Sequence, residues 1–163
     1  MRENVESLES SVWHRKYWPN RQYWLIIYNP RVHIQICRRF RVISFNTLNR
    51  QAKKLFHQMR RGDVALVKPS GVNEFTDVWG IASPARSNPN DSQPWATLGQ
   101  LRGRVFDQIA DIEVLEVFDP PIGLPQPITH VIGNKPFRPG IVQLSMGEFH
   151  RLYLMLTGKR CPY

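Results

Sequence analysis

The chain has 163 residues, 42% of them hydrophobic and 21% charged, as expected for one globular domain that buries a core without metal or disulfide support. Two cysteines are too few for a disulfide framework or a zinc site, so we expect Cys37 and Cys161 to be buried free thiols. No apolar run is long enough for a membrane span and no signal-peptide pattern opens the sequence, so we expect a cytoplasmic protein without membrane contact. We also expect the protein to be a monomer.

The formal net charge is +9, from 22 Lys and Arg against 13 Asp and Glu, and the excess is unevenly placed. Between Ser10 and Gly62 there are twelve basic residues and no acidic one. Such a block attracts polyanions, and the Trp and Tyr residues within it favour nucleic acid over a membrane surface. The block supplies seven candidates for phosphate contacts: Arg38, Arg39, Arg41, Arg50, Lys53, Lys54 and Arg61.

Residues 1–20 are predicted to form an N-terminal appendage, partly helical or flexible, in front of a domain that covers residues 21–163. Pro19-Asn20 marks the break between the two. Trp13 and Trp18 would either stack on bases or pack a short helix against the domain, and packing is the commoner outcome.

Two strand signals open the domain. Residues 23–28 (YWLIIY) are almost all apolar, which predicts a central strand buried on both faces. Residues 32–37 (VHIQIC) alternate apolar and polar side chains, which predicts an edge strand or a hairpin arm.

An amphipathic helix and two strands are predicted next. One apolar stripe at helical spacing comprises Ala52, Leu55, Phe56 and Met59. Gly62 is expected to end this helix in the left-handed conformation. Residues 64–67 form a short apolar run typical of a buried strand, and residues 78–82 (VWGIA) read as its antiparallel return.

The second half of the chain alternates loops with strands and ends in a helix. Residues 83–94 predict a surface loop, residues 95–101 a helical turn, and residues 104–118 a strand. Residues 120–127 (PPIGLPQP) are expected to form an extended loop, because prolines cannot donate ladder hydrogen bonds. Ser145 and Glu148 have the spacing of a capping box at the start of the last helix, which Gly158 ends.

Catalytic or metal-binding patterns are absent from the sequence, so we predict no catalytic residue, no metal and no cofactor. The acidic residues of 107–116 would suit a metal-dependent nuclease only with a lysine at short range, and none follows Glu113. Their alternation also fits the solvated face of a strand. His33 and His57 are interpreted as surface residues beside the basic block.

Reading a single base requires a cage of flat rings and fixed polar groups for the Watson–Crick edge of the base. The aromatic candidates are Tyr28, Phe45, Trp79, Trp95 and Phe137, and the polar candidates are Asn29, Ser44, Asn46 and Asn134. Each aromatic ring fits a hydrophobic core as well as a cage. Ser44 and Asn46 fit helix capping equally well.

Several short motifs occur in one order along the chain. They are YWL at 23–25, RRGD at 60–63, WGIA at 79–82, ITHVIGNKPFRPG at 128–140 and QLS at 143–145. Together they resemble the EVE domain of the PUA-like superfamily, which is related to the YTH readers of methylated adenine in RNA. The resemblance covers roughly residues 22–156.

The resemblance implies an α+β fold, a PUA-like bent β-barrel with flanking helices, and a pocket for a flipped, modified base. It implies that Ser44 is a polar pocket residue and that Asn29 contacts the base. Ile43 stands where the YTH readers have a cage tryptophan, so Phe45 or Trp79 would have to replace it.

The loop that contains Asn134 matches the opposite wall of the pocket, with Phe137 as its aromatic residue. Two basic residues of the same loop, Lys135 and Arg138, complete the set of phosphate candidates.

The sequence therefore predicts a non-catalytic module that recognises a modified base in nucleic acid, with modified cytosine in DNA favoured over RNA. EVE domains often belong to restriction systems, so a nuclease partner in a restriction or defence system is expected. An RNA-binding PUA-like protein acting on tRNA or rRNA is the first alternative. A metal-dependent nuclease subunit is the second.

Overall fold

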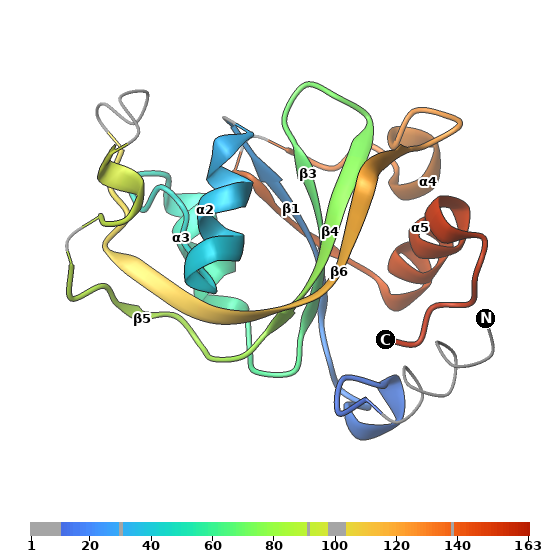
Figure 1. Ribbon diagram of the computed structural model, residues 1–163, viewed down its shortest axis with the longest axis horizontal. Coiled ribbons are helices and arrows are strands. Elements are labelled where there is room, and N and C mark those ends of the chain that lie inside the picture. Colours follow the sequence, from blue (N-terminus) through green and yellow to red (C-terminus); the bar gives the residue numbers. More distant parts are fainter. Residues whose placement is uncertain (1–10, 30, 91, 98–103, 138) are drawn as a thin grey trace.

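The computed structural model describes residues 11–29, 31–90, 92–97, 104–137 and 139–163. Its centre is a strongly curled sheet, a half-barrel, with helices α2 and α3 on one side and α4 and α5 on the other (Figure 1). The predicted α+β class and the bent sheet with flanking helices are confirmed.

The sheet has seven strands in the order β2-β6-β4-β3-β1-β7, and β5 also pairs with β6. The strands are β1 (Tyr23–Tyr28), β2 (Val42–Ile43), β3 (Val64–Pro69), β4 (Glu74–Ile81), β5 (Arg86–Ser87), β6 (Gln108–Gly123) and β7 (Ile141–Leu144). Strand β1 lies between β3, to which it is parallel, and the antiparallel β7, so the predicted central strand is confirmed. The antiparallel pairing of β3 with β4 confirms the predicted return.

The helices are α2 (Val32–Phe40), α3 (Arg50–Gln58), α4 (Thr129–Ile132) and α5 (Met146–Thr157), with 3-10 turns η1 (Arg15–Tyr17) and η2 (Trp95–Thr97). The capping box of α5 is present as predicted: Glu148 N donates to Ser145 Oγ at 3.1 Å, and Ser145 N donates to Glu148 Oε1 at 2.8 Å. Gly158 ends α5 at φ +70°. Within the described ranges, no helix is long and apolar enough to cross a membrane.

The predicted strand at residues 32–37 is wrong, because these residues form most of α2. His33, Ile34 and Cys37 are the buried side chains of this helix, and their spacing marks one helical face. An alternating pattern of six residues also fits a short helix whose inner face packs on a sheet, so contacts with the sheet decided the outcome.

Gly62 does not end the preceding helix, which is a second correction. Helix α3 ends at Gln58, and Met59 is extended and almost fully buried. Gly62 still needs its freedom, since it has φ +95° and an added Cβ would lie 2.1 Å from the Trp18 ring.

Residues 120–127 are only partly a loop, because β6 continues through Pro120 and Pro121 to Gly123. The register between β4 and β6 shifts here: Phe75 pairs with Ile122, whereas Asp77 pairs with Val117. The prolines fall within this irregular stretch, where they interrupt no regular ladder.

The two faces of the sheet carry separate hydrophobic cores. Trp24, Ile26 and Tyr28 of β1 join the core under α2 and α3, while Tyr23 and Leu25 join the core under α4 and α5. Because β1 is buried on both faces, its sequence is a continuous apolar run. Both cysteines are buried and free, as predicted.

The described part of the N-terminal segment packs against the domain. Trp13 is 7% exposed and donates its Nε1 hydrogen to Glu113. Arg15 N donates to Pro162 O at 2.9 Å, so this segment also contacts the C-terminal residues. Residues 1–10 of the predicted appendage lie outside the described residues.

Candidate functional site

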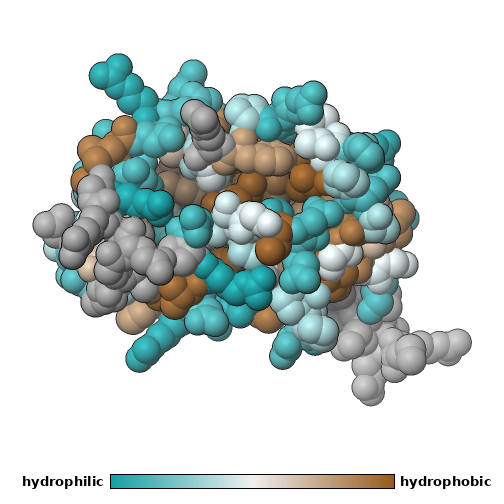
Figure 2. Space-filling view, turned by 90° about the horizontal axis from the view of Figure 1, so that it is seen from above, coloured by the Kyte–Doolittle hydropathy of each residue, from teal (hydrophilic) through white to brown (hydrophobic). Residues whose placement is uncertain are grey.

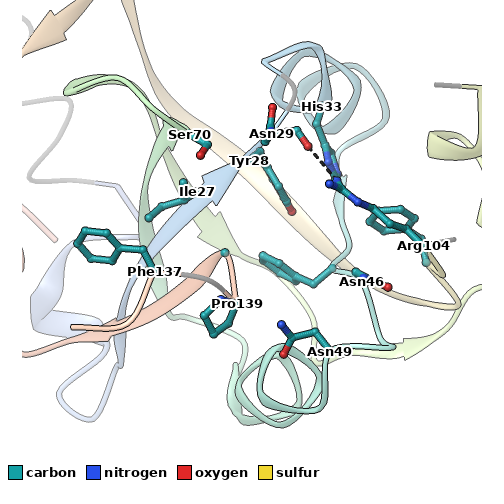
Figure 3. Close-up of a pocket in the computed structure, with 13 residues that line it drawn as sticks. Ile27, Tyr28, Asn29, His33, Asn46, Asn49, Ser70, Arg104, Phe137 and Pro139 are labelled. Carbon is teal, nitrogen blue, oxygen red and sulfur yellow. Dashed lines mark hydrogen bonds between the residues drawn. The ribbon is translucent and has the colours of Figure 1, made fainter. Parts of the chain in front are cut away.

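A pocket of about 450 Å³ opens where β1 ends, and segments far apart in the sequence line it. Figure 3 shows Tyr28 between Asn46 and Asn49 on one side and Phe137 on the other. The lining residues are Ile27, Tyr28, Asn29, His33, Phe45, Asn46, Asn49, Ser70, Arg104, Phe106, Phe137, Pro139 and Gly140. The volume is within the range of small-molecule sites in proteins.

Stacked rings form one wall of the pocket. Tyr28 stacks on His33 with ring centroids 3.8 Å apart and planes 15° apart, and on Phe45 at 5.4 Å and 28°. The Tyr28 hydroxyl donates to Ser44 O at 2.8 Å, which fixes the ring. These rings are almost fully buried, with Tyr28 4% and Phe45 3% exposed, so they form a rigid aromatic lining of the pocket.

Two asparagine side chains provide hydrogen-bond donors at the pocket. Asn46 Oδ1 accepts from Val105 N at 3.1 Å and from Leu48 N at 3.3 Å, and Asn49 Oδ1 caps α3 by accepting from Ala52 N at 3.0 Å. Since these oxygens are already bonded to backbone N–H groups, each amide is left with its NH₂ group for a ligand.

His33 lies inside the pocket wall, although the sequence was interpreted as placing it on the surface. It is 2% exposed, and its Nε2 atom has no hydrogen-bond partner among the described residues. Burial, together with the smaller effect of the nearby Arg104 cation, lowers the pKa of His33 to about 3. The imidazole is therefore neutral at physiological pH. His57 is exposed, as predicted.

Arg104 lies at the edge of the pocket, where Nη1 donates to Asn29 O at 3.1 Å (Figure 3). The Asn29 side chain makes no hydrogen bond with the part of the chain that the structure describes. The hydrogen bond to the Asn29 carbonyl fixes the Arg104 side chain. The Asn29 amide and the remaining N–H groups of the Arg104 guanidinium are open to a ligand.

Five of the nine predicted base-contacting residues line this pocket: Tyr28, Asn29, Phe45, Asn46 and Phe137. The other four lie elsewhere. Ser44 and Trp79 are fully buried, with the Ser44 hydroxyl donating to Gln108 O and Trp79 Nε1 donating to Asp77 at 2.8 Å. Trp95 packs behind the wall against Phe106, and Asn134 is exposed outside the lining.

Sequence reasoning did not assign the remaining lining residues to the pocket. Asn49 was visible as a polar residue before the helix, but its capping role explains it equally well. Gly140 has φ +75° and its carbonyl accepts from Ile27 N at 2.9 Å, so this glycine lets the loop close on β1. Ser70 and Arg104 carry no local signal, because β3 and the segment before β6 reach the pocket only through the fold.

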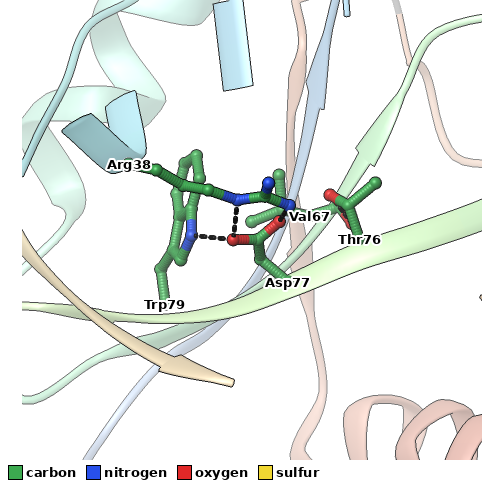
Figure 4. Close-up of polar contacts among 5 residues, drawn as sticks. All are labelled: Arg38, Val67, Thr76, Asp77 and Trp79. Atoms are coloured by element: carbon green, nitrogen blue, oxygen red, sulfur yellow. Dashed lines mark hydrogen bonds and ion pairs between the residues drawn. The ribbon is translucent and has the colours of Figure 1, made fainter. Parts of the chain in front are cut away.

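Some of the predicted phosphate-binding side chains already form ion pairs within the protein, and others do not. Arg38 pairs with the buried Asp77 through both carboxylate oxygens, with Nε 2.7 Å from Oδ2, and Trp79 donates to the same carboxylate (Figure 4). Lys135 pairs with Glu148 at 3.3 Å. Arg138 lies outside the described residues.

Six candidates are exposed and form no ion pair with the described residues: Arg39, Arg41, Arg50, Lys53, Lys54 and Arg61. Arg50, Lys53 and Lys54 belong to α3, whose cap Asn49 lines the pocket. Figure 2 views the molecule from the side toward which β1 runs, and hydrophilic side chains surround a band of apolar surface there.

The carboxylates of β6 are bound to separate partners. Asp111 pairs with Arg86 at 2.8 Å, and Glu116 accepts from the hydroxyls of Tyr153 and Tyr163 at 2.8 and 2.7 Å. Within the described ranges, no group of three metal-ligating side chains is present. These carboxylates therefore stabilise contacts between elements and do not form a cluster.

No model of a protein family matches the sequence, and no curated protein matches it. Solved structures do match. A Pseudomonas putida protein is 16% identical over 82% of this chain and 98% of its own, with a TM-score of 0.57. A Leishmania major protein is 14% identical over 86% and 97%, with a TM-score of 0.59.

A third match is the YTH domain of the MRB1 protein from Zygosaccharomyces rouxii, solved in complex with N6-methyladenosine RNA. It is 12% identical over 86% of this chain and 90% of its own, with a TM-score of 0.58. The matches therefore extend over most of this chain at low identity. The chain has the PUA-like fold of the YTH domains.

Proposed function

We propose that this protein is a non-catalytic module that binds nucleic acid and holds one modified base in the pocket at the end of β1. One observation carries the proposal. The stacked, almost fully buried rings of Tyr28 and Phe45 line a pocket together with the amide donors of Asn46 and Asn49, beside a helix whose exposed side is basic. Stacking, edge recognition and phosphate attraction are the three interactions that a base reader needs.

The chemistry of the pocket favours cytosine over adenine. The Watson–Crick edge of cytosine presents two neighbouring acceptors, O2 and N3, and one amino donor, whereas the edge of adenine presents one acceptor and one donor. Two amide NH₂ groups, from Asn46 and Asn49, complement two acceptors. The proposal is therefore a modified cytosine, in DNA by the resemblance to EVE domains, and we propose that the chain belongs to those domains.

RNA is the second candidate polymer, because the Zygosaccharomyces rouxii YTH domain of the same fold was solved with N6-methyladenosine RNA. That complex supports a methylated base as the ligand of this fold. A module that only binds acts through another protein, so the proposal includes a partner, such as the nuclease of a restriction or defence system.

The test is the dissociation constant for duplexes with 5-methylcytosine, 5-hydroxymethylcytosine or plain cytosine, measured beside N6-methyladenine duplexes and the matched RNA. Modification is expected to tighten binding by about tenfold, which corresponds to about 1.4 kcal/mol. A change below about twofold on both polymers would refute the reader function.

Asn49→Ser isolates the donor, because serine keeps an oxygen that can cap α3 while it lacks the amide NH₂ group. This variant is expected to bind the modified ligand about tenfold more weakly, the cost of one lost hydrogen bond to the base. Asn134→Ser is the matched control, since Asn134 is exposed outside the lining. Equal losses of affinity in the two variants would show that Asn49 does not contact the base.

A further inference from the structure

The rim of the pocket carries a tight turn. Asn49 N donates to Asn46 O at 3.1 Å, the hydrogen bond of a β-turn, which leaves Thr47 and Leu48 at its tip. Both ends of the turn line the pocket, where Figure 3 shows Asn46 and Asn49 next to each other. The tip of the turn therefore stands beside the mouth of the pocket.

Hydrogen bonds to the segment before β6 and within the turn fix the backbone of this turn. Thr47 N donates to Val105 O at 2.9 Å, and its hydroxyl donates to Asp107 Oδ1 at 2.7 Å. Asn46 Oδ1 accepts from Val105 N and from Leu48 N. A turn with these bonds presents its remaining side chain in a fixed position.

That remaining side chain is Leu48, which is 62% exposed. Single exposed leucines are ordinary on protein surfaces, so exposure alone has no meaning here. Its position is what matters: an apolar group on a fixed tip, between two pocket residues, just before the basic residues Arg50 and Lys53 of α3.

A base that leaves a duplex costs a few kcal/mol in lost stacking and pairing and leaves a gap in the stack. Apolar side chains that insert between base steps are a known physical solution to this cost.

We propose that Leu48 is a wedge that inserts into a nucleic-acid duplex and fills the gap left by the base that enters the pocket. The inference rests on the proposed function and deepens it, because it names the substrate as a duplex. The wedge lowers the cost of extruding the base, and the aromatic wall and the amide donors bind the extruded base.

The experiment compares three ligands with the same modified base: a fully paired duplex, a duplex in which an abasic site faces that base, and the single strand. Leu48→Ala is expected to weaken binding to the paired duplex by about tenfold and to the other two ligands by less than about twofold. Leu48→Met, which keeps an apolar side chain of similar volume, is expected to bind the paired duplex like the original protein.

Leu154→Ala is the matched control, because Leu154 is 51% exposed on α5, on the other side of the sheet. The wedge proposal is wrong if Leu48→Ala weakens binding to all three ligands equally, or if it leaves binding to the paired duplex unchanged. It is also wrong if the original protein binds the modified single strand and no duplex, an outcome under which the proposed function stands. A protein that ignores the modification on every ligand refutes the proposed function itself.

Discussion

At the scale of single residues, Asp63 explains the structural role of the RRGD motif. Its buried carboxylate accepts four hydrogen bonds, from the backbone and side-chain amide of Gln22, from Trp24 Nε1 and from Arg60 N, at 2.9 to 3.0 Å. The carboxylate thereby fixes the start of β1 to the turn between α3 and β3. The RRGD motif at 60–63 is thus a structural joint, with Gly62 providing the left-handed turn and Asp63 the acceptors.

His33 leads to a prediction about pH. Its pKa is about 3 in the folded protein, against 6.5 for an unperturbed histidine. Between these two values the unfolded chain binds a proton at this ring and the folded chain does not, so stability falls as the pH falls. From pH 7 to pH 5 the loss attributable to His33 is about 2 kcal/mol.

Urea unfolding of the original protein and of His33→Phe at pH 7 and pH 5 measures this effect. Phenylalanine keeps a flat ring beside Tyr28 and cannot titrate, so the variant should lose about 2 kcal/mol less stability on acidification. The comparison between the two proteins removes the contribution of all other titrating groups. Parallel pH profiles would contradict the buried, neutral state of His33.

At the scale of elements, a charged contact with a buried carboxylate attaches α2 to the sheet. Arg38 of α2 forms its ion pair with Asp77 of β4, whose side chain is fully buried and also accepts from Trp79 (Figure 4). A buried carboxylate without its partner keeps the cost of desolvation. Arg38 is therefore a structural residue in this fold, because its guanidinium already binds the Asp77 carboxylate through two nitrogens.

Arg38→Ala is accordingly expected to lower the free energy of unfolding by about 3 kcal/mol, because Asp77 stays buried without a counter-charge. It should leave the salt dependence of nucleic-acid binding unchanged. Arg39→Ala is the matched control. Arg39 is exposed next to Arg38, so its removal should lower the free energy of unfolding by no more than about 0.5 kcal/mol. Equal stability of the two variants in urea would show that the pair contributes nothing to holding α2.

At the scale of the whole molecule, folding leaves only part of the basic block exposed and unpaired among the described residues. Arg21 is buried, Arg31 pairs with Glu74 at 3.7 Å and Arg38 pairs with Asp77. The cations that remain exposed include Arg50, Lys53 and Lys54 of α3, whose N-cap Asn49 lines the pocket. Under the proposed function, this charge governs affinity and encounter rate, while the pocket governs selectivity.

The double variant Lys53→Glu with Lys54→Glu tests this division. It should weaken binding to modified and plain ligands by the same factor, and should reduce the slope of log affinity against log salt by about 2, one for each lost phosphate contact. Lys159→Glu with Arg160→Glu is the control of equal charge change at exposed positions beyond α5. Identical slopes in the two double variants would place the phosphates elsewhere.

The sequence by itself determined those features that depend on neighbours along the chain. The unbroken apolar run of β1, the stripe of α3 and the capping box of α5 each extend over enough residues, or include a specific enough cap, to leave one reading. The acid-free basic block was equally visible. Phe45 and Asn46 could be chosen as pocket residues because they stand where a strand passes into a helix.

Tertiary structure decided what depends on distant partners. The six residues at 32–37 fit both strand and helix, and packing on the curled sheet made them helical. Asn46 is bonded to Val105, and Gly140 to Ile27, so the pocket exists only once segments far apart in sequence have met. A ring in the sequence, such as Trp79, does not reveal whether it will face a ligand or the core. That choice depends on the curl and register of the sheet, and both are set by long-range pairing.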